Sequence, residues 1–161
     1  MVLQPTYDPD IDAQALRELL VKRELGRIAG FQLGPDEAPG PVAFTQVRTQ
    51  HAIRALAEQR FGGGALQGLP PPVEESPGIP PPIQRDALAE RAKRYEALFD
   101  RLVQTQPLPT APPELAAQRA QAIARYLGEQ EVPSSSVRPA APEQIQATDD
   151  TVPTGMRLQG G

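Results

Sequence analysis

Apolar residues recur at helical spacing in several stretches of the chain, most clearly between residues 113 and 130. A period of 3.6 residues places such positions on one side of a helix. Pro113 suits a first turn, Glu114 favours the positive end of the helix dipole, and Gly128 and Pro133 mark where the pattern stops. The sequence therefore predicts one amphipathic helix here. Its apolar stripe consists of Ala116, Ala120, Ile123 and Leu127.

A second stripe begins after residue 85 and has the cleanest amphipathic spacing in the chain. Its members are Leu88, Ala92, Tyr95, Phe99 and Leu102. The connection to the helix at 113–130 is QTQPLPTAPP, which is short enough to bring two helices side by side. We therefore expect an antiparallel helical pair in which the two stripes meet.

The N-terminal region has a turn and then a helix that runs to about Ala29. Asp10 or Asp12 can accept hydrogen bonds from the amides of its first turn. The helix has two apolar patches on nearly opposite sides, so it can contact two neighbours. Both patches are expected in the intramolecular core, although an exposed patch would suit a partner protein. The patches are Leu16, Leu19 and Leu20, and Val21, Leu25 and Ile28.

Turns and proline-rich segments separate these helices. Residues 34–41, GPDEAPGP, have turn chemistry, and Thr45 can cap a helix that the glycines at 62–64 end. Apolar positions in that helix are Ala52, Ile53, Leu56 and Ala57. Prolines between Leu69 and Pro82 prevent a helix, which favours an extended spacer over a ligand for an aromatic groove. We therefore expect a helical region at 1–66, a linker at 67–84 and a third region at 85–161.

After residue 130 the pattern changes to short strand candidates separated by Pro, Ser and Asp. The candidates are Val137–Arg138, Ile145–Ala147 and Gly155–Gln159. We expect two strands here, packed on the helices. The predicted fold class is therefore α+β and mainly helical, with about four helices, two short C-terminal strands and proline-rich linkers.

Composition limits the size of the core and the choice of partner. The 161 residues include no Trp, four Phe and three Tyr, so any core depends on aliphatic side chains. The net charge is −4 and the basic residues are scattered, which argues against nucleic acid as a partner. Without cysteine there are no disulfides or thiolate metal sites. No segment has the length and apolarity of a signal peptide or a membrane span.

Candidate catalytic chemistry is sparse. His51 is the only histidine, and no carboxylate pair at metal-ligand spacing accompanies it, so we interpret it as a surface or packing residue. The glycines at 62–64 lack the preceding strand and the Lys-Ser/Thr pair of a phosphate-binding loop. The acidic residues show no spacing that pairs an acid with a base. We expect no enzyme, no cofactor, no catalytic residue and no metal site.

The residues from Leu115 to Leu127, LAAQRAQAIARYL, resemble the helix of OmpA-like domains, whose pattern is L-S-x-x-R-A-x-x-V-x-x-Y-L. The following EVPSSSVR, ending at Arg138, is similar to the next turn and strand of that family. The resemblance implies that Arg119 is a ligand contact, since the family's Arg and an upstream Asp hold the diaminopimelate of peptidoglycan. Counting back without gaps, the position of that Asp is occupied by Gln104, so Arg119 lacks its expected partner.

A second resemblance covers more of the chain and rests on the order of its segments. Tyr7-Asp8 with Asp12, then RYEALFDRLVQTQPLP, then ELAAQRAQAIARYL resemble the C-terminal region of large AsmA-like bacterial envelope proteins, a domain of unknown function. Members of that family are anchored in the inner membrane and extend through the periplasm, with a suspected role in lipid movement or outer-membrane integrity. The resemblance implies a periplasmic or envelope-associated, non-enzymatic piece that docks on a larger envelope protein or another protein partner.

Two other functions agree with the same residues. The OmpA-like helix alone would suit a peptidoglycan-binding module that uses Arg119. The proline-rich segments and small helices would suit an adaptor or assembly protein, for example of a phage particle, and the lack of a signal peptide would then place the protein in the cytoplasm. The sequence does not separate these alternatives.

Overall fold

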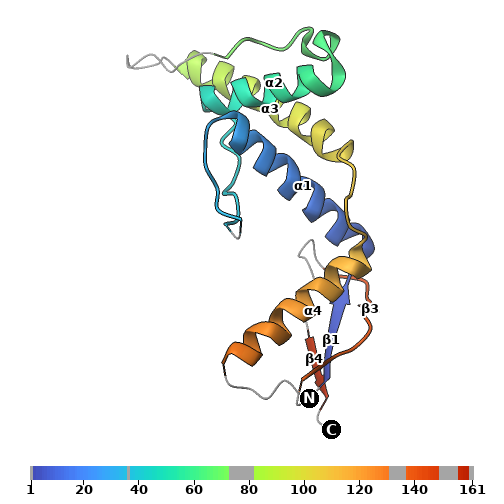
Figure 1. Ribbon diagram of the computed structural model, residues 1–161. Coiled ribbons are helices and arrows are strands. Elements are labelled where there is room, and N and C mark those ends of the chain that lie inside the picture. Colours follow the sequence, from blue (N-terminus) through green and yellow to red (C-terminus); the bar gives the residue numbers. More distant parts are fainter. Residues whose placement is uncertain (1, 36, 73–81, 131–136, 149–155, 160–161) are drawn as a thin grey trace. The chain divides into compact units, whose positions relative to one another are not determined.

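The computed structural model describes residues 2–35, 37–72, 82–130, 137–148 and 156–159. The chain forms two compact units. We call Met1–Leu16 with Pro107–Gly161 the terminal unit, and Arg17–Gln106 the helical unit. The predicted class, mainly helical α+β, is confirmed (Figure 1). The elements are β1 (Val2–Tyr7), α1 (Pro9–Ile28), α2 (Val47–Phe61), the short 3-10 helix η1 (Gly63–Leu66), α3 (Pro82–Gln104), α4 (Pro112–Glu129), β2 (Arg138–Pro139), β3 (Glu143–Gln144) and β4 (Met156–Gln159).

Strand β1 is the centre of the small sheet in the terminal unit. Both β2 and β3 pair with it in parallel, with Val2 opposite Arg138 and Thr6 opposite Glu143. Strand β4 pairs with β1 antiparallel, and Leu3 lies opposite Leu158. The N-terminal strand therefore receives all its described partners from the C-terminal end of the sequence. The sequence predicts two C-terminal strands, whereas the described residues form three, and it misses β1.

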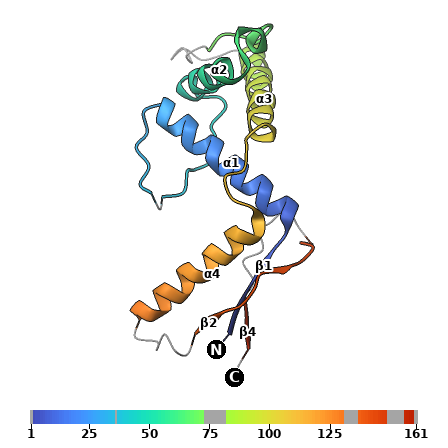
Figure 2. The same cartoon turned by 45° about the vertical axis from the view of Figure 1, so that its right-hand side comes forward.

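Helix α4 packs against β1 and β2, and Figure 2 shows it running beside them. Ala116 and Ala120 are fully buried, and their small side chains allow the helix to approach the sheet closely. Among the described residues of this unit, Leu3, Pro5 and Val137 are also buried. Ile123 is 39% exposed although it belongs to the predicted stripe. Only the N-terminal half of the stripe is therefore covered.

The start of α1 is capped by Asp8, which lies between β1 and the helix. Its Oδ1 accepts hydrogen bonds from the backbone N–H groups of Asp10 at 3.0 Å and Ile11 at 3.1 Å. Pro9 takes the first helical position, where a missing N–H has no cost. The sequence predicts that Asp10 or Asp12 accepts the first-turn amides; Asp8 does so instead, because the helix begins earlier than the apolar pattern does, and Asp12 accepts the backbone N–H of Asp8 itself.

The helical unit has its own core, which contains side chains from α1, α2 and α3. Ile53, Leu56, Tyr95 and Leu102 are among its largest buried side chains. The second apolar patch of α1 lies in this core, which is the intramolecular role that the sequence predicts. The buried residues of this core in the described part of the unit are Val21, Leu25, Ala52, Ile53, Leu56, Ala57, Tyr95, Leu98, Phe99, Leu102 and Val103.

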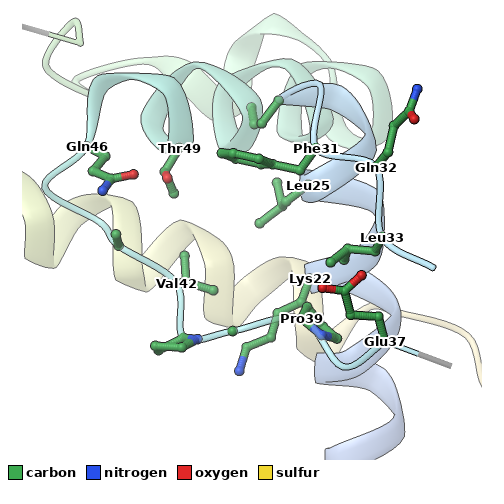
Figure 3. A pocket seen from close by; sticks show the side chains of 16 residues that line it. Lys22, Leu25, Phe31, Gln32, Leu33, Glu37, Pro39, Val42, Gln46 and Thr49 are labelled. Carbon is green, nitrogen blue, oxygen red and sulfur yellow. The ribbon is translucent and has the colours of Figure 1, made fainter. Parts of the chain in front are cut away.

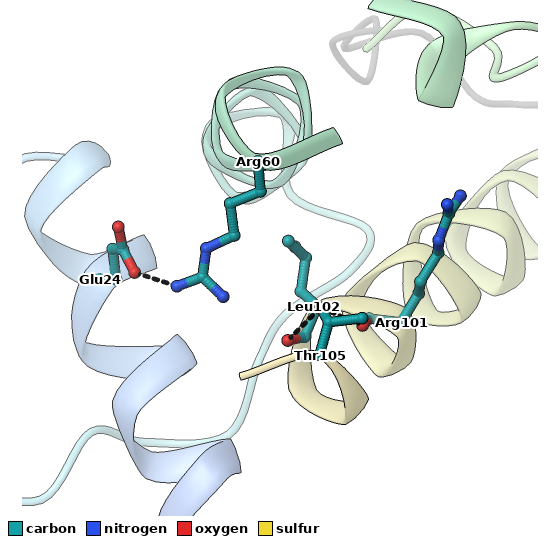
Figure 4. A network of polar contacts seen from close by, with 5 residues as sticks. All are labelled: Glu24, Arg60, Arg101, Leu102 and Thr105. Atoms are coloured by element: carbon teal, nitrogen blue, oxygen red, sulfur yellow. Dashed lines mark hydrogen bonds and ion pairs between the residues drawn. The ribbon is translucent and has the colours of Figure 1, made fainter. Parts of the chain in front are cut away.

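Polar contacts also tie the helices of this unit together. Arg60 on α2 forms an ion pair with Glu24 on α1 and so joins these two helices (Figure 4). Directly after α3, the Thr105 hydroxyl donates to backbone carbonyls of the last turn of that helix. Gly62 ends α2 with a φ of 79°, as the glycine run predicts. Thr45 does not cap the helix; the N-cap residue is Gln46, which makes no side-chain cap bond.

The two units divide the chain differently from the regions expected at 1–66, 67–84 and 85–161. Helix α3 belongs to the helical unit and packs on α2, whereas α4 belongs to the terminal unit and packs on β1. Each helix of the expected antiparallel pair thus packs within its own unit, and the stripe of α4 is covered only in part. Residues 73–81 of the expected linker lie outside the described residues, and α3 begins at Pro82.

Candidate functional site

Arg119, the candidate contact residue, lies on α4 in the terminal unit, beside the first turns of α1. Its Nη2 is 2.5 Å from Oδ1 of Asp12, and the two groups form an ion pair. The Asp12 side chain is completely buried, whereas that of Arg119 is 31% exposed. The expectation that Arg119 lacks a carboxylate partner is therefore wrong. The partner is far upstream, because the whole helical unit lies between the two residues in the sequence.

The second oxygen of Asp12 is also occupied. Oδ2 accepts a hydrogen bond of 2.8 Å from the backbone N–H of Asp8. This carboxylate therefore joins the end of β1, the first turn of α1 and the middle of α4. A buried carboxylate is stable only when it is paired and hydrogen-bonded, and here both conditions hold.

Asp8 extends the same network to the C-terminal segment. Its Oδ2 accepts a hydrogen bond of 2.9 Å from the backbone N–H of Ala147, a residue 139 positions away. This bond, together with that from the N–H of Ile11, lowers the pKa of Asp8 below its ordinary value of 3.8, against the opposing effect of desolvation. The ionised carboxylate is thus the form that holds these segments together.

The geometry decides what Arg119 and Asp12 can do. Clamping a zwitterion requires a cation and an anion that both reach the ligand. Arg119 is partly accessible, but Asp12 has no accessible surface and both of its oxygens face protein groups. In this arrangement the pair ties the helices to the sheet. The partly exposed Arg119 side chain could contact a ligand carboxylate only as a single charge.

A hollow of about 460 Å³ lies in the helical unit, between the last turns of α1, the loop after it and the start of α2 (Figure 3). Leu25, Phe31, Leu33 and Val42 are among its apolar lining residues. Lys22 and Glu37 bring the charged groups, and Lys22 forms an ion pair of 2.6 Å with Glu18. The sequence analysis treats residues 34–41 only as a turn and misses this hollow. Phe31, an aromatic residue just before a Pro/Gly-rich loop, is the signal that could have found it.

The other sequence expectations concern His51, metal-binding groups and membrane-spanning helices. His51 lies in the first turns of α2 and its side chain is exposed. Within the described residues, no three His, Asp or Glu side chains come together at metal-binding geometry. No helix in that part of the chain is both long enough and apolar enough to cross a membrane.

No protein-family model, curated protein or solved structure matches this chain. Function therefore has to be inferred from the residues themselves.

Proposed function

We propose that this chain is a non-enzymatic, envelope-associated interaction protein that resembles the tail of AsmA-like proteins. The observation that carries the proposal is the assembly of the terminal unit. Two of the three segments that bear the resemblance, Tyr7-Asp8 with Asp12 and the helix with Arg119, lie far apart in the sequence and meet around one ion pair. A tail with this construction can dock on a larger envelope protein or on another protein in the periplasm.

Exposed apolar side chains on α4 support the interaction role. Tyr126 is 59% exposed and Ile123 is 39% exposed, one turn apart on the C-terminal half of the helix. Large apolar side chains that gather on a surface are typical of contact sites. The described groups that face solvent here do not include a paired acid and base, which fits binding better than catalysis.

The test places a photo-crosslinking benzoylphenylalanine in place of Tyr126 and exposes the purified chain to separate envelope and cytosolic fractions of the source cells. The proposal expects crosslinked bands from the envelope fraction. The control carries the crosslinker in place of Thr148, which is exposed in the same unit but on another segment. Bands from the cytosolic fraction alone would favour the adaptor function instead.

A cheaper test is to sequence the genomic DNA immediately upstream of the codon for Met1. An in-frame coding region for a β-rich protein with a membrane anchor supports the AsmA-like proposal. A ribosome-binding site directly before Met1, with no coding frame behind it, contradicts it and moves the adaptor function to first place.

Peptidoglycan binding is a second candidate, favoured by one observation: the side chain of Arg119 is 31% exposed, although its guanidinium is paired with a carboxylate. Cosedimentation with purified sacculi tests it. Binding should fall in Arg119→Ala and persist in Arg125→Ala, an exposed arginine on the same helix. Equal binding by both variants removes this candidate.

A further inference from the structure

Phe31 is the most exposed aromatic residue of the helical unit in the part of the chain that the structure describes. It follows α1 directly, and half of its surface is accessible to solvent. The guanidinium of Arg48, on α2, lies over its ring at 5.4 Å from the centroid. An aromatic ring in contact with a cation and open to water is an unusual arrangement for a side chain that only fills a core.

Phe31 is shared by two hollows. The first is the hollow of about 460 Å³ already described, with apolar walls and the ammonium of Lys22 (Figure 3), and we call it the apolar hollow. Among the described lining residues, Glu37 provides the carboxylate, and its Oε2 accepts a 3.1 Å hydrogen bond from the backbone N–H of Gly34. It can take a small apolar side chain whose neighbours lie at the surface.

The second hollow, which we call the basic hollow, has a volume of about 490 Å³ and shares Phe31, Gln32 and Leu33 with the apolar hollow. Arg23 and Arg27 provide its charges, and no described carboxylate lines it. Nη2 of Arg23 donates a 2.9 Å hydrogen bond to the carbonyl of Pro35, which uses one of the five donors of that guanidinium. Both arginines are exposed. In a chain of net charge −4, this is a local concentration of positive charge.

The loop that forms both hollows is fastened at several points. The backbone N–H of Phe31 donates to the carbonyl of Gly26 at 2.8 Å, and that of Glu37 donates to the carbonyl of Gly34 at 3.1 Å. At its far end, the side-chain amide of Gln50 donates to the carbonyl of Phe44 at 2.8 Å. A site held in shape before binding loses less entropy when its ligand arrives.

We propose that this surface binds an acidic, extended peptide segment of a partner protein, with one apolar side chain in the apolar hollow and carboxylates on Arg23 and Arg27. Charge complementarity selects the occupant, since the charged residues among the described lining of the basic hollow, Arg23 and Arg27, are both cations. The shape selects a peptide, because the lining residues Phe31, Gln32 and Gly34 are exposed and leave the site open along its length. A membrane surface would need a protruding apolar face, whereas this site is recessed. The proposal rests on the interaction function proposed above and names the partner's chemistry.

Fluorescence anisotropy of the full chain with labelled synthetic peptides tests it. The probe alternates Glu with Leu; one matched peptide replaces every Glu with Gln, and another replaces every Leu with Ala. The probe should bind more tightly than both, and its affinity should fall as salt is added. Phe31→Ala should weaken binding about ten-fold, as expected for a central anchor.

Arg27→Gln should weaken binding about two- to five-fold, the effect of losing one solvent-exposed charge contact. Arg125→Gln is the matched control, an exposed helical arginine in the terminal unit, and should leave binding unchanged. Circular dichroism of each variant establishes that the helices are intact.

Three results would overturn the proposal. They are a probe Kd above about 1 mM, equal losses in Arg27→Gln and Arg125→Gln, and binding to anionic phospholipid vesicles that needs Phe31 while the peptide does not bind. The crosslinking at position 126 uses the other unit, so envelope crosslinks that persist in Phe31→Ala would leave the proposed function standing while this site fails.

Discussion

Replacing one partner of the ion pair between Asp12 and Arg119 should cost more stability than replacing the other. Replacing Arg119 with Met keeps much of the side-chain volume but leaves the carboxylate of Asp12 without its cation. That carboxylate has no solvent-accessible surface, so water cannot replace the lost partner. Breaking a buried pair typically costs 3–5 kcal/mol, and because Arg119 is 31% exposed we expect about 2–4 kcal/mol here.

The reverse replacement, Asp12→Asn, should cost less. The amide oxygen can still accept the N–H of Asp8, and the guanidinium left behind can turn toward solvent because it is partly exposed. We expect about 1–2 kcal/mol, the cost of one weakened hydrogen bond to a charged group. In the double variant no buried charge is left unpaired, so its cost should be smaller than the sum of the two single costs by about 1–2 kcal/mol.

Amide hydrogen exchange read by mass spectrometry measures these costs where they arise. Peptides that cover β1 and α4 report on the terminal unit, and peptides from α3 serve as the internal reference because that helix belongs to the helical unit. Arg119→Met should speed exchange in β1 and α4 by roughly 30- to 1,000-fold, since 1.4 kcal/mol corresponds to about a factor of ten. If Asp12→Asn costs as much as Arg119→Met, or if the double variant is additive, the burial argument is refuted.

Three further predictions concern the stability effects of replacing Asp8, Gly62 and Ala120. Folding lowers the pKa of Asp8, so the stability that this carboxylate contributes is complete above its ordinary pKa of 3.8 and is lost as the pH falls through the folded-state pKa. Asp8→Asn should therefore reduce the loss of stability at acid pH when urea unfolding is measured across a pH series. Gly62→Ala should cost about 1–3 kcal/mol because φ is 79°, whereas Gly63→Ala, which has equal space, should cost little when both are measured by urea unfolding. Ala120→Leu should cost about 1–3 kcal/mol by overpacking α4 on β1, and thermal melts should show nearly no change for the exposed Ala122→Leu.

Helices were accessible to sequence reasoning because each carries a long apolar stripe. The stripes predicted α2, α3 and α4, and Tyr95 and Leu102 are buried as their spacing requires. Strand β1 was missed because Pro5 interrupts it, and a proline normally argues against a central strand. Here Pro5 lies opposite Met156 in β4, at the edge of a very short ladder.

The candidate site was only half predictable, for a physical reason. The helix motif identifies Arg119 but does not identify the carboxylate that pairs with it, since counting back along the family pattern without gaps reaches Gln104. In the sequence, Asp12 comes before the helical unit and Arg119 comes after it. Folding of the terminal unit brings Oδ1 of Asp12 to 2.5 Å from Nη2 of Arg119. Helix periodicity reports which side of a helix is buried; it does not report which distant segment covers that side.

The sheet around β1 has a consequence for synthesis on the ribosome. The helical unit consists of one continuous stretch, Arg17–Gln106, so it can fold as soon as that stretch has emerged. Strand β1 is made before the helical unit and has to wait for β2, β3 and β4, which follow that unit, and the Asp8–Ala147 hydrogen bond closes a separation of 139 positions. Long-range closure of this kind is slow. During translation β1 therefore stays available to other strand-forming chains until its partners β2, β3 and β4 have been made.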